Sequence, residues 1–258
     1  MKLFVVGTGP GSISHMSGRA MEILKSVECV AGYTTYIELV KELVSDKEVI
    51  STGMMKEVDR VEQAIDAALS GKTCALISSG DPGIYAMAGL VFDICMKRQI
   101  KISRDTEQAG KNRLCLEIIP GIPALAAGAA IAGAPLTHDF AAISLSDLLT
   151  PWEKIENRLN HAAAADFVIV IYNPKSKKRD WQLGKARKII LKHRDSDTPV
   201  AVVKAAMRET QSLEFCTLGE LDQADVDMQT VIFIGSSTSL RYLDFMFTPR
   251  GYAKKYSI

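Results

Sequence analysis

The sequence lacks the features that mark membrane, secreted and nucleic-acid-binding proteins. No apolar run approaches the roughly 20 residues that a membrane-spanning helix needs, and the apolar start at residues 3–6 is too short for a secretory leader. The charges nearly cancel, with 31 basic and 30 acidic residues, so the strong positive field of a nucleic-acid binder is missing. We therefore expect a cytoplasmic protein that binds neither membranes nor nucleic acids.

Cysteine and histidine are also scarce. The five cysteines form no C-x-x-C pair, which argues against a disulfide framework and a cysteine-rich metal site. The four histidines lack the spacing of metal ligands and lie at His15, His138, His161 and His193. We expect a reducing compartment and no protein-bound metal.

Apart from these absences, the composition is that of an ordinary globular protein, with 47% hydrophobic and 24% charged residues. Short apolar runs, typical of strands buried on both faces, occur at 3–6, 74–78, 114–119, 167–171, 200–203 and 231–234. Amphipathic helix patterns lie between them at 57–69, 87–96, 152–159 and 184–191. The alternation predicts an α/β protein with mainly parallel sheets.

Two segments organise the chain. Pro120-Gly121-Ile122-Pro123 follows a predicted strand and is the best domain boundary, which gives domains 1–119 and 120–258. The polar segment 99–113 separates a helix pattern from the next strand and is expected to be an exposed loop.

The first motif is the glycine loop Gly7-Thr8-Gly9-Pro10-Gly11, directly after the first strand. A dinucleotide fingerprint would need glycine where Ser12 stands, and Pro10 lacks the N–H that a phosphate cradle uses. A P-loop at 71–73 is equally weak, because Asp66 occupies its first glycine position. Taken alone, residues 7–11 fit a structural turn as well as a binding loop.

Two further motifs follow other predicted strands. Ser79-Gly80-Asp81-Pro82 lies at a strand end, where open α/β sheets bind ligands, although Asp81 could simply hydrogen-bond its own turn. Residues 120–124 precede an alanine-rich helix predicted at 125–132, whose N-terminus offers N–H donors to a carboxylate. A plain strand-to-helix connection is the alternative.

In this order and at these spacings, the three motifs resemble the tetrapyrrole methylase family over essentially the full chain. The resemblance implies a kidney-shaped α/β fold of two domains, each a mixed, mainly parallel sheet flanked by helices, with the active site in the cleft between them. It also implies a homodimer that uses S-adenosyl-L-methionine and releases S-adenosyl-L-homocysteine. The cofactor residues that it implies are Pro10, Gly80, Asp81, Pro82, Tyr85, Pro123, Ala124, Asn173, Ala205 and Ala206.

Segments 142–152 and 171–179 resemble those of the C17-methyltransferases within that family. This implies methylation of C17 of precorrin-3B or cobalt-factor III, with ring contraction to (cobalt-)precorrin-4, in cobalamin biosynthesis. The alternatives are a methylase acting on another ring carbon or on a protein or RNA target, and a non-catalytic nucleotide-binding module. Near-zero net charge disfavours RNA.

The substrate of such an enzyme carries many carboxylates, so positive charge must be concentrated locally. The basic residues proposed to bind it are Lys175, Lys177, Lys178 and Arg179. A solvated basic loop is an equal alternative if position is ignored, but the place beside Asn173-Pro174 at a strand end favours binding. Ring contraction also needs proton transfers, for which we select Ser144, Asp147 and His138. A hydrolase triad is disfavoured because no G-x-S-x-G elbow occurs in the chain.

Overall fold

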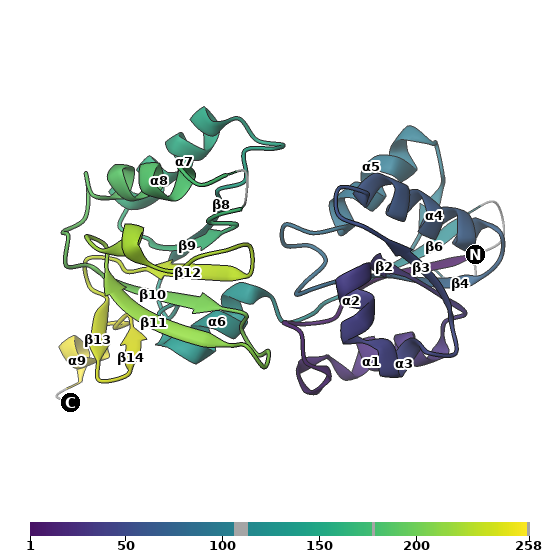
Figure 1. The fold of residues 1–258 in the computed structure, drawn as a ribbon, viewed down its shortest axis with the longest axis horizontal. Helices are drawn as coiled ribbons and strands as arrows, with labels where there is room; N and C mark the ends of the chain where they lie inside the picture. Colours follow the sequence, from purple (N-terminus) through teal and green to yellow (C-terminus); the bar gives the residue numbers. More distant parts are fainter. Residues whose placement is uncertain (106–112, 177–178, 257–258) are drawn as a thin grey trace. The chain divides into compact units, whose positions relative to one another are not determined.

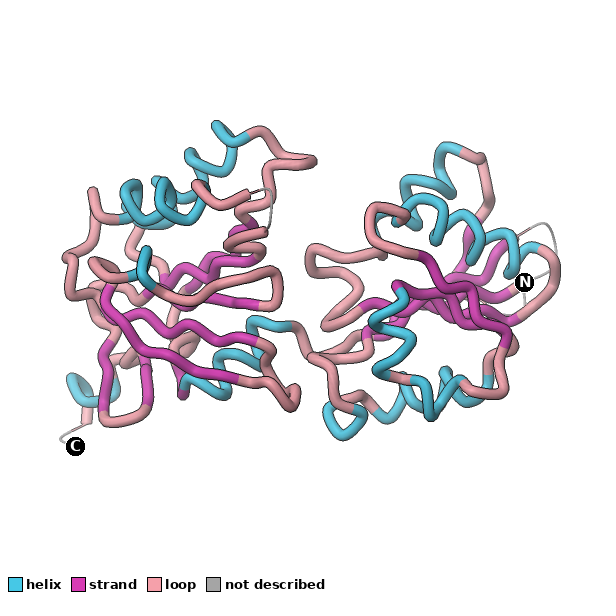
Figure 2. Tube along the Cα trace, in the orientation of Figure 1, coloured by secondary structure: helices cyan, strands magenta, loops and turns pink. Residues whose placement is uncertain are grey.

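The computed structural model describes residues 1–105, 113–176 and 179–256. It divides into two compact units, Met1–Pro123 and Ala124–Ile258, and each is an α/β arrangement of strands between helices (Figures 1 and 2). Among the described helices, none is long and apolar enough to cross a membrane.

The first unit contains a six-stranded sheet with the order β3-β2-β4-β1-β6-β5. Its strands are β1 Lys2–Gly7, β2 Cys29–Tyr33, β3 Glu48–Thr52, β4 Thr73–Ser78, β5 Ile102–Ser103 and β6 Leu114–Ile119. Every pairing between these strands is parallel. Parallel neighbours need crossover connections, so helices come to lie on both faces.

Alternate residues of the strands pack against different helices. Leu3 and Val5 share a buried cluster with α4 Glu57–Leu69 and α5 Ala88–Lys97. Phe4 and Val6 contact the opposite layer, which is visible below the sheet in Figure 1. That layer consists of α1 Gly18–Ser26, α2 Thr34–Leu39 and α3 Lys41–Val44.

Most predicted elements of this unit are confirmed. The apolar runs at 3–6, 74–78 and 114–119 form β1, β4 and β6, and the helix predicted at 57–69 is α4. The segment 99–113 is not only a loop, because β5 lies inside it and pairs with β6. An edge strand pairs through its backbone N–H and C=O groups, so a polar segment without an apolar pattern can also form one. Residues 106–112 lie outside the described residues.

The second unit contains a five-stranded sheet with the order β11-β10-β12-β9-β8. Its strands are β8 Phe140–Ser144, β9 Val168–Tyr172, β10 Pro199–Lys204, β11 Ser212–Thr217 and β12 Thr230–Ile234. Only β8 and β9 pair in parallel, whereas β12 runs antiparallel to both β9 and β10, and β11 antiparallel to β10. The prediction of a mainly parallel sheet is therefore wrong for this unit.

The physical reason is that burial on both faces, and not strand direction, makes a strand continuously apolar. Helices α7 Trp152–Ala164 and α8 Gln182–Ile190 cover one face of the sheet, and α6 Ala124–Ala132 covers the other (Figure 1). All five residues of β12 are consequently buried. Its sequence thus looks the same as that of a parallel strand.

The alanine-rich helix predicted at 125–132 is confirmed as α6 and packs closely on the sheet. A Cβ added at Gly128 would lie 2.7 Å from a methyl group of Val231 and 2.8 Å from the ring of Phe233. The chain then forms a small sheet of order β13-β14-β7. Its strands are β7 Gly133–Ala134, β13 Leu240–Tyr242 and β14 Phe245–Phe247, and α9 Tyr252–Lys255 follows.

Candidate active site

The first two sequence motifs meet as backbone at the carboxyl ends of β1 and β4. Gly9 N donates to Gly80 O at 3.2 Å, and Gly80 N donates to Gly9 O at 2.7 Å. Thr8 N donates to Ser78 O at 2.9 Å. Both Gly9 (φ 74°) and Gly80 (φ 67°) are left-handed, which glycine adopts without steric cost.

The third motif joins them through close backbone packing. A Cβ on Gly121 would lie 2.2 Å from Gly80 O and 2.8 Å from Gly7 C. A Cβ on Gly7 would lie 2.6 Å from both Gly121 N and Gly80 O. Since neither position has room for a side chain, the three loops form one glycine-lined junction where β1, β4 and β6 end.

The carboxylate of Asp81 links two of the three loops by hydrogen bonds. Its Oδ1 accepts from Gly83 N at 2.8 Å, which closes its own turn, and its Oδ2 accepts from Gly121 N at 3.2 Å. Both carboxylate oxygens are therefore used within the protein. This favours a positioning role for Asp81 over direct ligand contact.

Several predicted cofactor residues have unusual backbone conformations. Tyr85 (φ 52°), Asn173 (φ 52°) and Ala205 (φ 48°) are three of the eight described non-glycine residues with positive φ. Such strain persists only where the surroundings impose it, and it gathers at functional sites. Tyr85 is also 54% exposed, so its ring is accessible to a ligand.

The remaining predicted cofactor residues flank these points. Pro10 and Pro82 are buried, Pro123 precedes α6, and Ala124 begins it. The next N–H of that helix, from Leu125, donates to the hydroxyl of Tyr172 at 2.9 Å. One of the free donors at the helix N-terminus is thus already satisfied.

In the second unit, predicted residues gather at the edge of the sheet where β8, β9 and β10 end. Asn173 Nδ2 donates to Ser144 Oγ at 2.9 Å, and Ser146 N donates to the same oxygen at 3.2 Å. Ala205 and Ala206, both buried, directly follow β10. The structure therefore brings Ser144 and Asn173 together.

Asp147 follows Ser144 in the loop after β8. Its Oδ2 accepts from Gln182 Nε2 at 3.0 Å, and Gln182 is only 2% exposed. Gln182 could not be selected from the sequence, because a polar residue at the start of an amphipathic helix normally faces solvent. Here it orients a carboxylate that sequence reasoning selected.

His138 lies elsewhere. It precedes β8, whereas Ser144 ends that strand, so the two residues are at opposite ends of β8. The imidazole Nδ1 lies 3.5 Å from Asp139 Oδ2 and its side chain is 53% exposed. Within the described part of the chain, no three metal-ligating side chains cluster around this or any other histidine.

The basic segment divides into exposed and buried parts. Lys175 is exposed and Arg179 is 6% exposed, while Lys177 and Lys178 lie outside the described residues. Ser176 N donates to Arg179 O at 2.8 Å and Arg179 N donates to Ser176 O at 3.1 Å, which closes a tight turn. Burial lowers the pKa of the Arg179 guanidinium, and the carboxylate of Asp147 opposes that shift.

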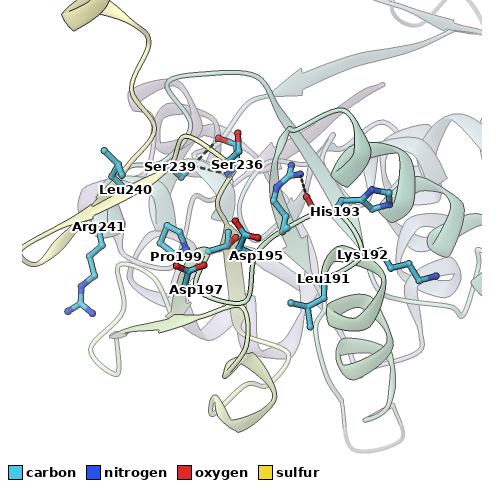
Figure 3. Close-up of a pocket in the computed structure, with 13 residues that line it drawn as sticks. Leu191, Lys192, His193, Asp195, Asp197, Pro199, Ser236, Ser239, Leu240 and Arg241 are labelled. Atoms are coloured by element: carbon cyan, nitrogen blue, oxygen red, sulfur yellow. Dashed lines mark hydrogen bonds between the residues drawn. The ribbon is translucent and has the colours of Figure 1, made fainter.

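A surface hollow of about 590 Å³ lies at the other end of the second sheet, where β10 begins. Figure 3 shows Ser236 and Ser239 hydrogen-bonded to one another on one side of it, with Asp195 and Asp197 near its middle. None of the predicted site residues lines it. Because its charges are of both signs and its hydroxyls bond one another, it selects no ligand class.

Comparison with known proteins decides the family. A model of the tetrapyrrole (corrin/porphyrin) methylases matches residues 2–222. The chain belongs to this family. The resemblance drawn from the three motifs is confirmed.

Related methylases match along the whole chain. It is 44% identical to the probable cobalt-factor III C(17)-methyltransferase of Salmonella typhimurium, over 97% of this chain and 99% of the relative. It is 39% identical to the precorrin-3B C(17)-methyltransferase of a Sinorhizobium species, over 97% of each. The cobalt-factor III methyltransferase of Priestia megaterium is 44% identical over 100% of this chain but 46% of the relative, so the chain spans about half of that protein.

Solved methylase structures have the same fold. The methyltransferase CobJ matches with a TM-score of 0.84 at 32% identity, over 96% of this chain and 99% of that one. A uroporphyrin-III C-methyltransferase from Thermus thermophilus, complexed with S-adenyl homocysteine, matches with a TM-score of 0.68 at 20% identity, over 91% and 97%. The second likeness concerns the fold alone. The predicted tetrapyrrole methylase-like α/β fold is confirmed.

Proposed function

We propose that this chain is an S-adenosyl-L-methionine-dependent C-methyltransferase that methylates C17 of precorrin-3B or cobalt-factor III. Ring contraction to (cobalt-)precorrin-4 would accompany the transfer, as a step of cobalamin biosynthesis. Full-length relatives that carry these names support the substrate. The single observation that carries the proposal is the glycine junction of Gly7, Gly80 and Gly121. There three loops meet as backbone without side chains, at the carboxyl ends of the strands, where open α/β sheets bind ligands.

The residues present fit S-adenosyl-L-methionine. We assign it to the ten residues that the family resemblance selected, with Asp81 positioning the loops. Among the others, Tyr85, Asn173 and Ala205 have strained conformations of the kind that gathers at functional sites. At Gly7 and Gly121 a Cβ would collide with neighbouring backbone, so the three loops can meet only where no side chain intervenes. When bound, the cofactor supplies an electrophilic methyl group, so the protein mainly has to hold the reacting carbons in line. A metal is not needed for this chemistry.

Ser144 and Asp147 are assigned to the proton transfers. Ser144 Oγ accepts hydrogen bonds from Asn173 Nδ2 and Ser146 N, so its own hydrogen is available for an oxygen of the substrate. Asp147 Oδ2 is held by Gln182, and the carboxylate can accept a proton. His138 remains a third proposal, with less support because it lies at the other end of β8.

The basic residues Lys175, Lys177, Lys178 and Arg179 are assigned to the carboxylates of the macrocycle. Opposite charges steer an anionic substrate and hold its periphery. We further propose that 1–119 and 120–258 are the folding domains and that the enzyme is cytoplasmic, as its composition indicates, and a homodimer, as the family resemblance implies.

The test is mass spectrometry and absorption spectroscopy of the product from precorrin-3B or cobalt-factor III with S-adenosyl-L-methionine. We expect a product one methyl group heavier with the spectrum of a contracted ring. Asp147→Asn and Ser144→Ala should slow contraction more than they weaken cofactor binding measured by calorimetry. Methylation at a different carbon would identify another enzyme of the pathway. Cofactor binding without any transfer would identify a non-catalytic module.

A further inference from the structure

The guanidinium of Arg179 is buried without an oxygen partner. Arg179 is 6% exposed, and its Nε and Nη1 have no hydrogen-bond partner. Its Nη2 donates to Met228 Sδ at 3.3 Å, and a thioether sulfur is a weak acceptor. A buried charge with unmatched donors is costly unless an anion joins it.

The other buried arginines of the described chain each bond several oxygen acceptors. Arg60 donates to Thr52 Oγ1 at 2.7 Å and to Gly53 O at 3.0 Å. Arg194 donates to Ala163 O at 2.6 Å and pairs with Asp166 Oδ1 at 2.9 Å, although its Nε has no partner. Arg179 has neither kind of contact. It differs from both in the lack of an oxygen acceptor.

Two further unmatched polar atoms lie on residues of α7 and α8 in the same unit. Asp147 opposes the effect of burial on the pKa of the guanidinium, but within the described residues no carboxylate lies within the 4 Å of an ion pair with it. Gln182, which bonds Asp147, leaves its Oε1 without a partner, as does the buried Nε1 of Trp152. The local polar network is thus incomplete.

Met228 provides a route to the guanidinium. It lies just before β12 and is 50% exposed, so its side chain can leave without disrupting the core. Methionine is flexible and gives up a contact at low cost. A carboxylate in place of the thioether would meet Nη2 first and could then use a second guanidinium donor, the fork geometry that arginine favours.

We propose that Arg179 is the receptor for one particular carboxylate of the tetrapyrrole, covered by Met228 until the substrate binds. The inference rests on the proposed function and sharpens it. Lys175 is exposed and attracts any carboxylate, whereas an enclosed, directional guanidinium accepts one side chain in one orientation. Arg179 therefore determines how the macrocycle is turned on the enzyme.

A carboxylate built into the chain tests the receptor without any substrate. Met228→Glu should bring an oxygen to Nη2 and raise the melting temperature by about 2 to 4 °C over the neutral control Met228→Gln. In an Arg179→Gln background this difference should vanish, as a double-mutant cycle requires of a direct interaction. A Met228→Glu protein no more stable than Met228→Gln would refute the receptor.

The second arm measures kinetics in the whole enzyme. Arg179→Gln should raise the tetrapyrrole KM about ten- to a hundredfold, and Met228→Glu should raise it too, because its carboxylate occupies the receptor. Affinity for S-adenosyl-L-homocysteine should not change in either. Arg194→Gln, a buried arginine at the other end of β10, should lower stability and leave the tetrapyrrole KM unaltered.

The outcomes separate the two proposals. Stabilisation by Met228→Glu together with a raised KM supports the receptor for this substrate. Stabilisation with an unchanged KM overturns the assignment to the substrate. If the wild-type protein transfers no methyl group to either tetrapyrrole, the proposed function fails, while the stability cycle still decides whether Arg179 receives a carboxylate.

Discussion

The two units differ in how they present their predicted site residues. In the first, these residues meet as backbone, at the junction of Gly7, Gly80 and Gly121. In the second, they are joined through side chains, because Asn173 bonds Ser144 and Gln182 bonds Asp147. A backbone site should be sensitive to added atoms, and a side-chain site to lost partners. This difference can be tested with substitutions that add a side chain in the first unit and remove a hydrogen-bond partner in the second.

The largest effect is expected from Gly121→Ala. Its Cβ would lie 2.2 Å from Gly80 O and 2.8 Å from Gly7 C, and neither backbone atom can move without disturbing β1 or β4. We expect a loss of about 3 kcal/mol in the free energy of unfolding, at the upper end for overpacking. Urea denaturation measures it, together with a calorimetric loss of cofactor binding.

Gly89→Ala is the matched control in the same unit. Gly89 lies in α5, and an added Cβ would meet nothing within 4 Å. Since alanine favours helix over glycine by up to about 1 kcal/mol, this variant should be slightly more stable than the wild type. If both variants behave alike, the crowding at the junction does not limit stability.

The second unit should respond to the loss of Asn173. Asn173→Ala removes the hydrogen bond to Ser144 and places a Cβ residue without a polar group at φ 52°. Asn173→Gly removes the same bond but relieves the backbone. We expect Asn173→Ala to unfold about 1 kcal/mol more easily than Asn173→Gly, and both to slow product formation. Equal stabilities would show that the left-handed conformation is not strained.

These contrasts also show what the sequence could predict. β1, β4, β6 and α4 follow from apolar periodicity, because burial between two helix layers leaves a local pattern. The antiparallel direction of β12 does not, since a strand covered on both faces has the same composition in either direction. Arg179 belongs to a basic run that the sequence allows to be either a substrate site or a solvated loop, and its contact with Met228, which is distant in sequence, has no local signal.

A smaller change in the free energy of unfolding should appear as the pH is lowered, and it comes from Asp166 in the second unit. Burial opposes ionisation of Asp166, but hydrogen bonds from Ser237 and the charges of Arg194 and His138 prevail and lower its pKa. A lowered folded-state pKa contributes stability above the unfolded value of about 3.9. That contribution is lost as pH falls through the folded pKa.

Melting temperatures of the wild type and Asp166→Asn, measured from pH 6 down to about pH 3, test this. The wild type should lose more stability than the variant over that interval, and the two curves should converge at the acid end. The glycine junction has no part in this titration, so cofactor binding near neutral pH should be the same in both proteins. If the two melting curves stay parallel across this pH range, ionisation of Asp166 does not contribute to the loss of stability in acid.

The smallest effect is expected from Lys175→Gln, which removes one exposed charge from the basic turn. An exposed ion pair contributes about 0.2–1 kcal/mol, so the tetrapyrrole KM should rise no more than about fivefold while cofactor affinity is unchanged. The rise should shrink as salt increases, because exposed charges are screened, whereas that of Arg179→Gln should persist. Adding Lys177→Gln and Lys178→Gln should multiply the Lys175 effect, and Lys192→Gln, at the hollow where β10 begins, should have none. A KM unchanged at low ionic strength would return the exposed lysines to a solvated loop and leave recognition of the carboxylates to Arg179.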